Sequence, residues 1–210
     1  MIGKSVLNEC LVKAEVKSIL AINRKTSEVQ QEKFSEIIHE NFFDLSAIQQ
    51  RLSGYDVCFF CAGISSVACS EKEYNHITYE MTLSVAKEIL KLNPSIIFCY
   101  ISGAGADSSE NGKIMWARIK GKTENALLKM PFNKVYCFRP GYIQPLGGIK
   151  SKTGLYNIFY AVLKPFYFLF KGFKSYVTDS KRVGKAFVKA ALIRYEKNIL
   201  ENSDINKIGS

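Results

Sequence analysis

Continuous apolar runs, separated by stretches of helical spacing, constrain the fold of this chain more than any other feature. There are five: residues 18–24, a short run within 35–46, and residues 56–63, 95–105 and 134–141. Because apolar and polar residues do not alternate within them, these runs predict strands that are covered on both faces, as in a parallel sheet.

Patterns of helical period fill the intervals between the apolar runs. Apolar residues recur every fourth position over residues 77–89, and Asn93-Pro94 ends that pattern. A short helix is also expected at residues 4–11, directly before the first apolar run. Strands and helices that alternate in this order predict an α/β fold, with a doubly wound parallel sheet and helices on both of its faces.

The last third of the chain differs in character from the rest. We expect a nucleotide-binding type of domain at residues 1–148, and a basic, aromatic segment with a final helix at 149–210. That helix should carry an apolar stripe over residues 183–191, with Asp179 or Ser180 as its N-cap.

Most of the positive charge of the chain lies in this last third. The formal net charge is +10, and residues 150–200 hold eleven Lys and Arg residues against Asp179 and Glu196. Within them, residues 155–170 are dense in aromatics but too interrupted to span a bilayer. Two interpretations remain open: a lid over a substrate pocket, or a segment that lies on an anionic membrane. Nucleic acid is not expected, because no reading motif accompanies the charge.

The six cysteines predict no metal site. Cys58 and Cys61 have the CxxC spacing of a redox or zinc site, but they fall within an expected strand. Residues three apart in a strand point to opposite faces, so the two sulfurs should diverge. We interpret these cysteines as small buried residues of a protein in a reducing compartment, and we expect it to be cytoplasmic.

Gly3 stands where a glycine-rich turn would open a helix. In a strand–turn–helix unit that binds a dinucleotide, the last glycine of the turn permits close packing of the helix on the strand. Arg24 lies twenty-one residues further on, which is about the spacing of the residue that reads the adenosine ribose. We therefore interpret Gly3 as the last glycine of this fingerprint, and expect about ten residues, a short strand and two glycines, to precede Met1.

The expected strand order has a consequence for the sheet. In a doubly wound sheet the first strand lies at the centre, between the strands expected at 18–24 and 56–63. Without that strand, two facing edges would carry backbone groups that lack partners, each at a cost of about 1–3 kcal/mol if buried. The two strands could pair directly, or a partner molecule could supply a strand. The chain could also form a homodimer.

In the order and spacing of its short motifs, the chain resembles the extended or atypical short-chain dehydrogenases/reductases, often labelled NAD-dependent epimerase/dehydratase. The resemblance covers about residues 1–145 and implies a Rossmann-type, NAD(P)-binding protein. In this family the glycine turn reads T-G-A-T-G-x-[IV]-G, of which "MIG" matches only the end. The resemblance implies these cofactor-binding positions: Gly3, Arg24, Lys25, Asp44, Leu45, Cys61, Ala62, Gly63, Lys120, Pro140 and Gly141.

The resemblance also implies catalytic positions, with one departure. Ser102 falls at the family's catalytic Ser/Thr and Lys120 at its catalytic lysine. The family's Y-x-x-x-K is here "WARIK", so that Trp116 replaces the tyrosine. An indole N–H can donate a hydrogen bond but cannot serve as a general acid or base. Tyr142, or a water held by Ser102, could take over the proton transfer.

Each of these residues also has a purely structural interpretation. Ser102 could cap a strand end, Arg24 could be a solvated surface charge and Lys120 an exposed helix lysine. Trp116 could be core packing, and residues 103–112 a flexible connector rather than the border of a substrate pocket.

Two classes of function follow from the sequence. The first is an oxidoreductase or epimerase-like enzyme that acts on a small carbonyl or sugar-like substrate. The second is a cofactor-binding sensor or interaction protein without dehydrogenase turnover, which Trp116 favours; peripheral membrane association through residues 155–170 is a further alternative. Arg24 and Lys25, with no acid beside them, favour the 2′-phosphate of NADP(H) over the free hydroxyl of NAD(H).

Overall fold

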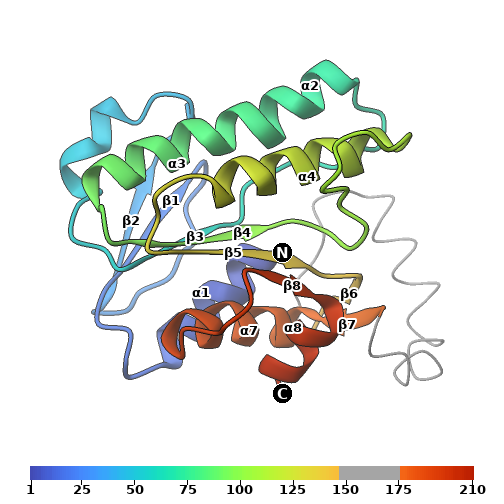
Figure 1. The fold of residues 1–210 in the computed structure, drawn as a ribbon. Helices are drawn as coiled ribbons and strands as arrows, with labels where there is room; N and C mark the ends of the chain where they lie inside the picture. Colours follow the sequence, from blue (N-terminus) through green and yellow to red (C-terminus); the bar gives the residue numbers. More distant parts are fainter. Residues whose placement is uncertain (147–175) are drawn as a thin grey trace.

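The computed structural model describes residues 1–146 and 176–210. They form three layers, with helices on both faces of a layer of parallel strands (Figure 1). Segment 155–170, interpreted above as a lid or a membrane-binding surface, lies outside the described residues. Within residues 1–146 and 176–210, no helix is both long and apolar enough to cross a membrane.

The strands form three parallel groups. The main sheet has the order β3 (Val57–Phe60), β4 (Ile97–Ile101), β5 (Lys134–Arg139) and β8 (Ile199–Glu201). A separate pair joins β1 (Ile19–Asn23) to β2 (Phe34–Ile38), and a second pair joins β6 (Tyr142–Gln144) to β7 (Val177–Asp179). The five expected strands are therefore confirmed as β1 to β5, whereas β6, β7 and β8 were not predicted.

Helices cover the two faces in separate groups. On one face lie α2 (Glu71–Asn75), α3 (Met81–Leu92) and α4 (Met115–Leu128); on the other lie α1 (Ile2–Val12), α7 (Ser180–Leu192) and α8 (Asn202–Ile208) (Figure 1). A π-helical turn, η2 (His76–Glu80), joins α2 to α3, and a 3₁₀-helix, η1 (Ser46–Arg51), precedes β3.

The helix ends follow the capping signals in the sequence. Asp179 caps α7, because its Oδ1 accepts a hydrogen bond from the backbone N–H of Arg182 at 2.8 Å. Asn93 ends α3, and its side chain accepts from the backbone N–H of Gly54 and donates to the carbonyl of Leu52. The three predicted helices are thus confirmed as α1, as η2 with α3, and as α7. The hydrogen bonds of Asn93 also hold the end of α3 to the loop before β3.

Helix α1 packs against α7, although the two elements lie near opposite ends of the sequence. The contact depends on Gly184, where an added Cβ would lie 2.5 Å from the carbonyl oxygen of Ser5. Val6 of α1 and Phe187 of α7 belong to one buried cluster with β4 and β5. Helix α7 therefore helps to complete the core of the sheet domain. The domain boundary expected at residue 148 stays a prediction.

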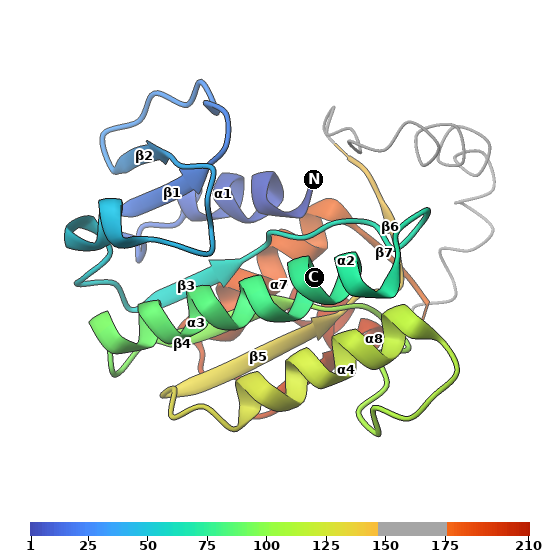
Figure 2. The same ribbon diagram turned by 90° about the horizontal axis from the view of Figure 1, so that it is seen from above.

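The sheet is interrupted between β1 and β3. Among the described residues these strands belong to different sheets, so the direct pairing considered above does not occur. Figure 2 shows the β1–β2 pair set apart from β3, β4 and β5. The strands nevertheless share both cores: Ile19 and Val57 pack on the side of α7, and Leu20 and Phe60 on the side of α3.

The CxxC cysteines lie on opposite faces, as the strand interpretation predicts. Cys58 packs in the cluster of α3, and Cys61 packs against the cluster of α1 and α7. All six cysteines, which fall within the described residues, are free thiols. Burial raises the pKa of both Cys58 and Cys61 to about 12, so neither is poised for redox chemistry or metal binding.

Candidate functional site

The carboxyl ends of the parallel strands bring several expected site residues to one edge of the fold. Arg24 follows β1, Cys61 follows β3, Ser102 follows β4 and Pro140 follows β5. In open α/β sheets, ligands bind in the crevice outside this edge. These four residues are therefore grouped where such a fold binds its ligand.

Ser102 is held rigidly at the end of β4. Its backbone N–H donates to the carbonyl of Phe138 at 2.8 Å, and the N–H of Ala104 donates to the carbonyl of Pro140 at 2.9 Å. The side chain is buried, yet within the described part of the chain its Oγ has no hydrogen-bond partner. A buried hydroxyl without a partner is costly, and a ligand oxygen would satisfy it.

Lys120 reaches from α4 to the same strand end. Its Nζ donates to the carbonyl of Ile101 at 3.1 Å and to the hydroxyl of Tyr100 at 3.5 Å, and it lies 5.1 Å from the centre of the Tyr100 ring. Burial lowers the pKa of Lys120 to about 8, although the carboxylate of Glu124 opposes that shift. The interpretation of Lys120 as an exposed helix lysine is therefore wrong.

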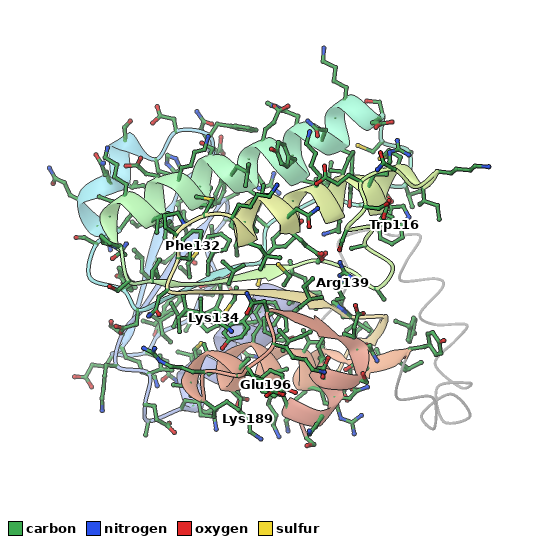
Figure 3. All side chains as sticks on the ribbon, viewed as in Figure 1. Trp116, Phe132, Lys134, Arg139, Lys189 and Glu196 are labelled. Carbon is green, nitrogen blue, oxygen red and sulfur yellow. The ribbon has the colours of Figure 1, made fainter. Side chains whose placement is uncertain are left out.

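Trp116 lies one turn before Lys120 and covers the loop that follows Ser102. A Cβ added at Gly103 would lie 3.8 Å from the Trp116 indole, and a Cβ added at Gly105 would lie 3.6 Å from it. Gly105 has a φ of +87°, a conformation that favours glycine. Figure 3 shows the Trp116 side chain at the amino end of α4. Trp116, which the resemblance predicts to stand in place of the family's tyrosine, thus lies next to the loop after Ser102, and its indole does not titrate.

Hydrogen bonds hold the loop of residues 103–112 together and attach it to α4. The carboxylate of Asp107 accepts hydrogen bonds from the hydroxyl of Ser109 at 2.6 Å and from the backbone N–H groups of Gly112 at 2.7 Å and Ser109 at 2.9 Å. These hydrogen bonds, that of the Ser109 hydroxyl above all, lower the pKa of Asp107. The backbone N–H of Asp107 donates to the carbonyl of Ala117 at 2.9 Å. Glycine is required where the loop meets the helix, because a Cβ at Gly121 would lie 1.8 Å from the Asp107 carbonyl oxygen.

The sequence analysis did not predict the buried ion pair between Glu124 and Arg139, which lies beside Lys120. Glu124 is fully buried, and its carboxylate accepts hydrogen bonds from the guanidinium of Arg139, which also reaches Glu201 and Ser108. These carboxylates raise the pKa of Arg139 further above its ordinary value. The signal was available: Glu124 lies one turn after Lys120, and Arg139 begins the R-P-G motif. Figure 3 shows Arg139 between α4 and β8.

The R-P-G segment holds the end of β5 in place. Pro140 is buried, and the backbone N–H of Gly141 donates to the side-chain oxygen of Asn202 at 2.8 Å. A Cβ at Gly141 would lie 2.2 Å from the carbonyl oxygen of Tyr176. Tyr142, the alternative proton donor, lies in β6, and its hydroxyl donates to Gln144 at 3.0 Å.

The expected dinucleotide-binding residues fall into two groups. Gly3 lies beside Cys61, since a Cβ on Gly3 would be 3.5 Å from the Cys61 Cβ, and Gly63 is exposed near the same end of β3. Asp44 instead lines a surface pocket of about 630 Å³ between η1 and α3, together with Tyr79. Leu45 is part of the core. Ser102 and Lys120 do not line that pocket.

Two exposed cationic side chains and one hydrogen-bonded carboxylate lie at the end of β1. Arg24 and Lys25 are both exposed. Glu36 of β2 was not expected here; its carboxylate accepts from the side chain of Asn23 at 2.7 Å and from the backbone N–H of Ser27 at 3.0 Å. These hydrogen bonds lower the pKa of Glu36 against a raising effect of burial.

Comparisons with known proteins point to one fold. No family model matches the chain. The protein "FMP52, mitochondrial" of Meyerozyma guilliermondii is 24% identical over 161 residues, which are 75% of this chain and 66% of that protein. The match thus leaves about a third of that relative without a counterpart in this chain.

Solved structures cover nearly the whole chain. A UDP-N-acetylglucosamine 4-epimerase from Methanobrevibacter ruminantium matches with a TM-score of 0.66 and 17% identity, over 95% of this chain and 72% of its own. A short-chain dehydrogenase/reductase from Saccharomyces cerevisiae matches with 0.64 and 13%, over 99% and 94%. The enzyme WbmF of Bordetella bronchiseptica, solved with NAD+, matches with 0.63 and 12%, over 98% and 73%. This chain therefore has the Rossmann-type fold of the short-chain dehydrogenases/reductases and nucleotide-sugar epimerases.

Proposed function

We propose that this protein binds a nicotinamide dinucleotide, NADP(H) in preference to NAD(H), and presents a small carbonyl or sugar-like substrate to Ser102 and Lys120. One observation carries the proposal. The half-buried ammonium of Lys120 donates a hydrogen bond to the carbonyl of Ile101, directly before Ser102, whose own hydroxyl lacks a partner among the described residues. A cation and a free hydroxyl at one strand end suit an oxygen that gains negative charge.

The residues present fit such a cofactor in most of its parts. Ser102 and Lys120 would face the nicotinamide end of the cofactor and the substrate, and the exposed Arg24 and Lys25 would offer cations to a 2′-phosphate. For the pyrophosphate, the described residues offer the amino end of α1, whose first N–H groups have no acceptor within the helix. The bound dinucleotide would supply or accept the hydride.

The side chains of this site would act on the substrate oxygen. The Ser102 hydroxyl would donate a hydrogen bond to that oxygen, and the Lys120 charge would favour negative charge on it. The indole of Trp116 would cover the loop after Ser102 and exclude water there. Since indole does not titrate in water and cannot serve as a general acid or base, proton transfer would have to pass through another group, such as Tyr142 or water.

Binding and turnover can be tested separately. We expect NADPH to quench the fluorescence of the single tryptophan, Trp116, in a saturable titration. Ser102→Ala should leave NADPH binding unchanged but abolish the oxidation of NADPH by carbonyl compounds or epimerisation of a nucleotide sugar. Thr178→Ala, which removes another buried hydroxyl without a partner in the described residues, is the matched control and should leave both unchanged. Failure of NADPH to bind would refute the proposal.

The second candidate is cofactor binding without turnover, and Trp116 is the observation that favours it. A protein of this kind would bind NADPH and change its interactions rather than oxidise the cofactor. Saturable NADPH binding with no NADPH oxidation over a broad panel of carbonyl compounds would select this function over the first.

The compartment and assembly of the protein remain predictions. The name of the Meyerozyma relative places that protein in the mitochondrion, whereas the free thiols of this chain are expected in a reducing compartment such as the cytoplasm. Fractionation of cells that express a tagged chain would decide between the cytoplasm, the mitochondrion and a membrane surface. Light scattering would test the expected homodimer.

A further inference from the structure

Two polar groups at the carboxyl end of β4 have hydrogen-bonding capacity that the described residues do not fill. The ammonium of Lys120 has three N–H donors, and two acceptors face it there: the carbonyl of Ile101 and the hydroxyl of Tyr100. The hydroxyl of Ser102, the residue directly after Ile101, has no partner in the same part of the chain. A substrate oxygen at this strand end could therefore accept hydrogen bonds from both Lys120 and Ser102.

Lys120 holds its charge without a carboxylate in contact. Within residues 1–146 and 176–210 it forms no salt bridge, because Glu124, the acid one turn further along α4, is paired with Arg139. A half-buried ammonium without such a partner gives up its proton more readily than a solvated one. Burial accordingly lowers the pKa of Lys120 to about 8, although the charge of Glu124 opposes that shift. Lys120 can therefore release a proton close to neutral pH.

Tyr100 of β4 holds the Lys120 ammonium at this strand end. Its side chain is buried, its hydroxyl lies 3.5 Å from Lys120 Nζ, and its ring centre lies 5.1 Å from the same atom. Tyr100 precedes Ser102 by two positions, the spacing at which strand side chains share a face. Both the accepting hydroxyl and the ring face favour the charged form of the lysine. Tyr100 therefore sets where the ammonium lies and supports its charge.

The other titratable groups that face Lys120 do not release a proton near neutral pH. Burial raises the pKa of Tyr100 and the pKa of Cys137 in β5 well above their ordinary values. Glu124 of α4 is fully buried, and its carboxylate accepts hydrogen bonds from the guanidinium of Arg139. Among these groups, Lys120 is therefore the one suited to act as a general acid.

We propose that Lys120, positioned by Tyr100, gives the substrate oxygen the proton that Trp116 cannot supply. The inference rests on the proposed function, in which the carbonyl carbon of the substrate receives a hydride. As it does so, one N–H bond of Lys120 breaks, an O–H bond forms on the substrate, and the electron pair of the broken bond stays on Nζ. Water then returns a proton to the amine. Tyr100 acts only through Lys120 and is a positioning residue.

Titration of Lys120 in the full chain tests the inference without any turnover. NMR of ¹³C-labelled lysine follows the Lys120 Cε shift with pH, and Lys120→Arg assigns the signal. We expect a midpoint near pH 8. Tyr100→Phe keeps the ring but removes the accepting hydroxyl, so its midpoint should move to lower pH. A wild-type midpoint near the ordinary lysine value of about 10.4, or the same midpoint in both chains, would overturn the proposal.

NADPH oxidation by carbonyl compounds provides the second test. Reduction needs the charged amine, so kcat/KM should be constant below about pH 8 and fall as the pH rises above it. Lys120→Arg keeps a cation that does not deprotonate, so kcat should fall at least about 100-fold while NADPH still binds. Lys122→Arg is the matched control on α4, at a lysine whose Nζ lies 4.2 Å from the Tyr79 ring centre, and should leave kcat unchanged.

Chemical rescue distinguishes a proton donor from a cation that only supports the site. Ethylammonium should restore turnover to Lys120→Ala, whereas tetramethylammonium, which carries charge but no N–H, should not. Equal rescue by the two ions would refute proton donation by Lys120, as would turnover that survives in Lys120→Arg but is lost in Tyr142→Phe. The wild-type titration and pH profile decide the question if the Lys120 variants do not fold.

The outcomes also separate this inference from the function on which it rests. Saturable NADPH binding without turnover would overturn the role of Lys120 and leave cofactor binding intact. Saturable binding with turnover that is independent of pH between 7 and 10 would likewise refute only the proton donor. Failure of NADPH to bind would refute the proposed function, and the inference with it.

Discussion

The carboxylate of Glu124 in α4 is buried against the guanidinium of Arg139 at the end of β5, with Arg139 Nε 3.0 Å from Glu124 Oε1. This pair links the helix that carries Lys120 to the strand that supports the Ser102 loop. Arg139→Met would leave the Glu124 charge buried without its partner, at a cost of about 3–5 kcal/mol in the free energy of unfolding.

Urea unfolding measures that cost, and a surface pair supplies the control. Arg118 pairs with Glu71, whose side chain is 60% exposed. Arg118→Met should therefore lower the unfolding free energy by about 1 kcal/mol or less. Equal losses in the two variants would show that the Glu124–Arg139 pair does not behave as a buried one.

The stability of the fold should depend on pH through Lys120. Its pKa of about 8 in the folded chain lies below the usual lysine value of about 10.4, so between these values the unfolded chain binds a proton that the folded chain lacks. Stability conferred by this residue should therefore rise with pH through that window and be lowest below pH 8. Urea unfolding of the wild type and of Lys120→Met from pH 7 to 10 isolates the effect; a constant difference between them would contradict it.

Trp116→Tyr should restore a titratable group next to Ser102 and Lys120. If proton transfer limits turnover, this variant should gain or increase NADPH-dependent carbonyl reduction, because a phenol can donate the proton that an indole cannot. Adding Lys120→Ala should remove the gain. Trp116→Phe serves as the control, and brisk wild-type turnover that Trp116→Phe leaves unchanged would show that another group transfers the proton.

Arg24→Ala should weaken NADPH binding more than NADH binding. A guanidinium that pairs with the 2′-phosphate contributes about 1.5–3 kcal/mol, so we expect at least about a tenfold loss for NADPH and little change for NADH. Titration of both cofactors measures it. Arg51→Ala, at an exposed arginine of η1, is the control and should change neither affinity. Tighter binding of NADH than NADPH by the wild type would sink the prediction.

Gly121→Ala should separate the Ser102 loop from α4. The added Cβ would lie 1.8 Å from the Asp107 carbonyl oxygen, which is backbone and can move only if the loop moves. Overpacking of this kind costs about 1–3 kcal/mol, sometimes more. At Gly63 a Cβ would have nothing within 4 Å, so Gly63→Ala should stay within about 0.5 kcal/mol of the wild type. Thermal unfolding of the two variants tests the contrast.

The elements that the sequence predicted are those specified by local pattern. Strands β3, β4 and β5 are continuous apolar runs, and α3 ends where Asn93 caps it. Strands β6, β7 and β8 span only three residues each, too few for such a pattern to show.

Features that depend on distant neighbours were not predictable in this way. Glu124 looks like a solvated helix residue until Arg139 is placed against it, and Glu36 approaches the end of β1 only through the β1–β2 pairing. Whether β1 would pair with β3 is likewise decided by packing between segments far apart in sequence. The group at the carboxyl edge of the strands was predicted in part: Ser102 and Lys120 converge, whereas Asp44 lies elsewhere.

The contact between Ser5 and Gly184 also bears on how the chain matures during synthesis. Helix α1 emerges from the ribosome first, but α7, the helix that buries the apolar side of α1, is synthesised near the end of translation. At roughly 5–20 residues per second, that interval lasts on the order of ten seconds or more. During it Val6 and Cys10 would be open to chaperones, so the yield of native protein should depend on elongation rate and chaperone supply more than the stability of the finished fold suggests.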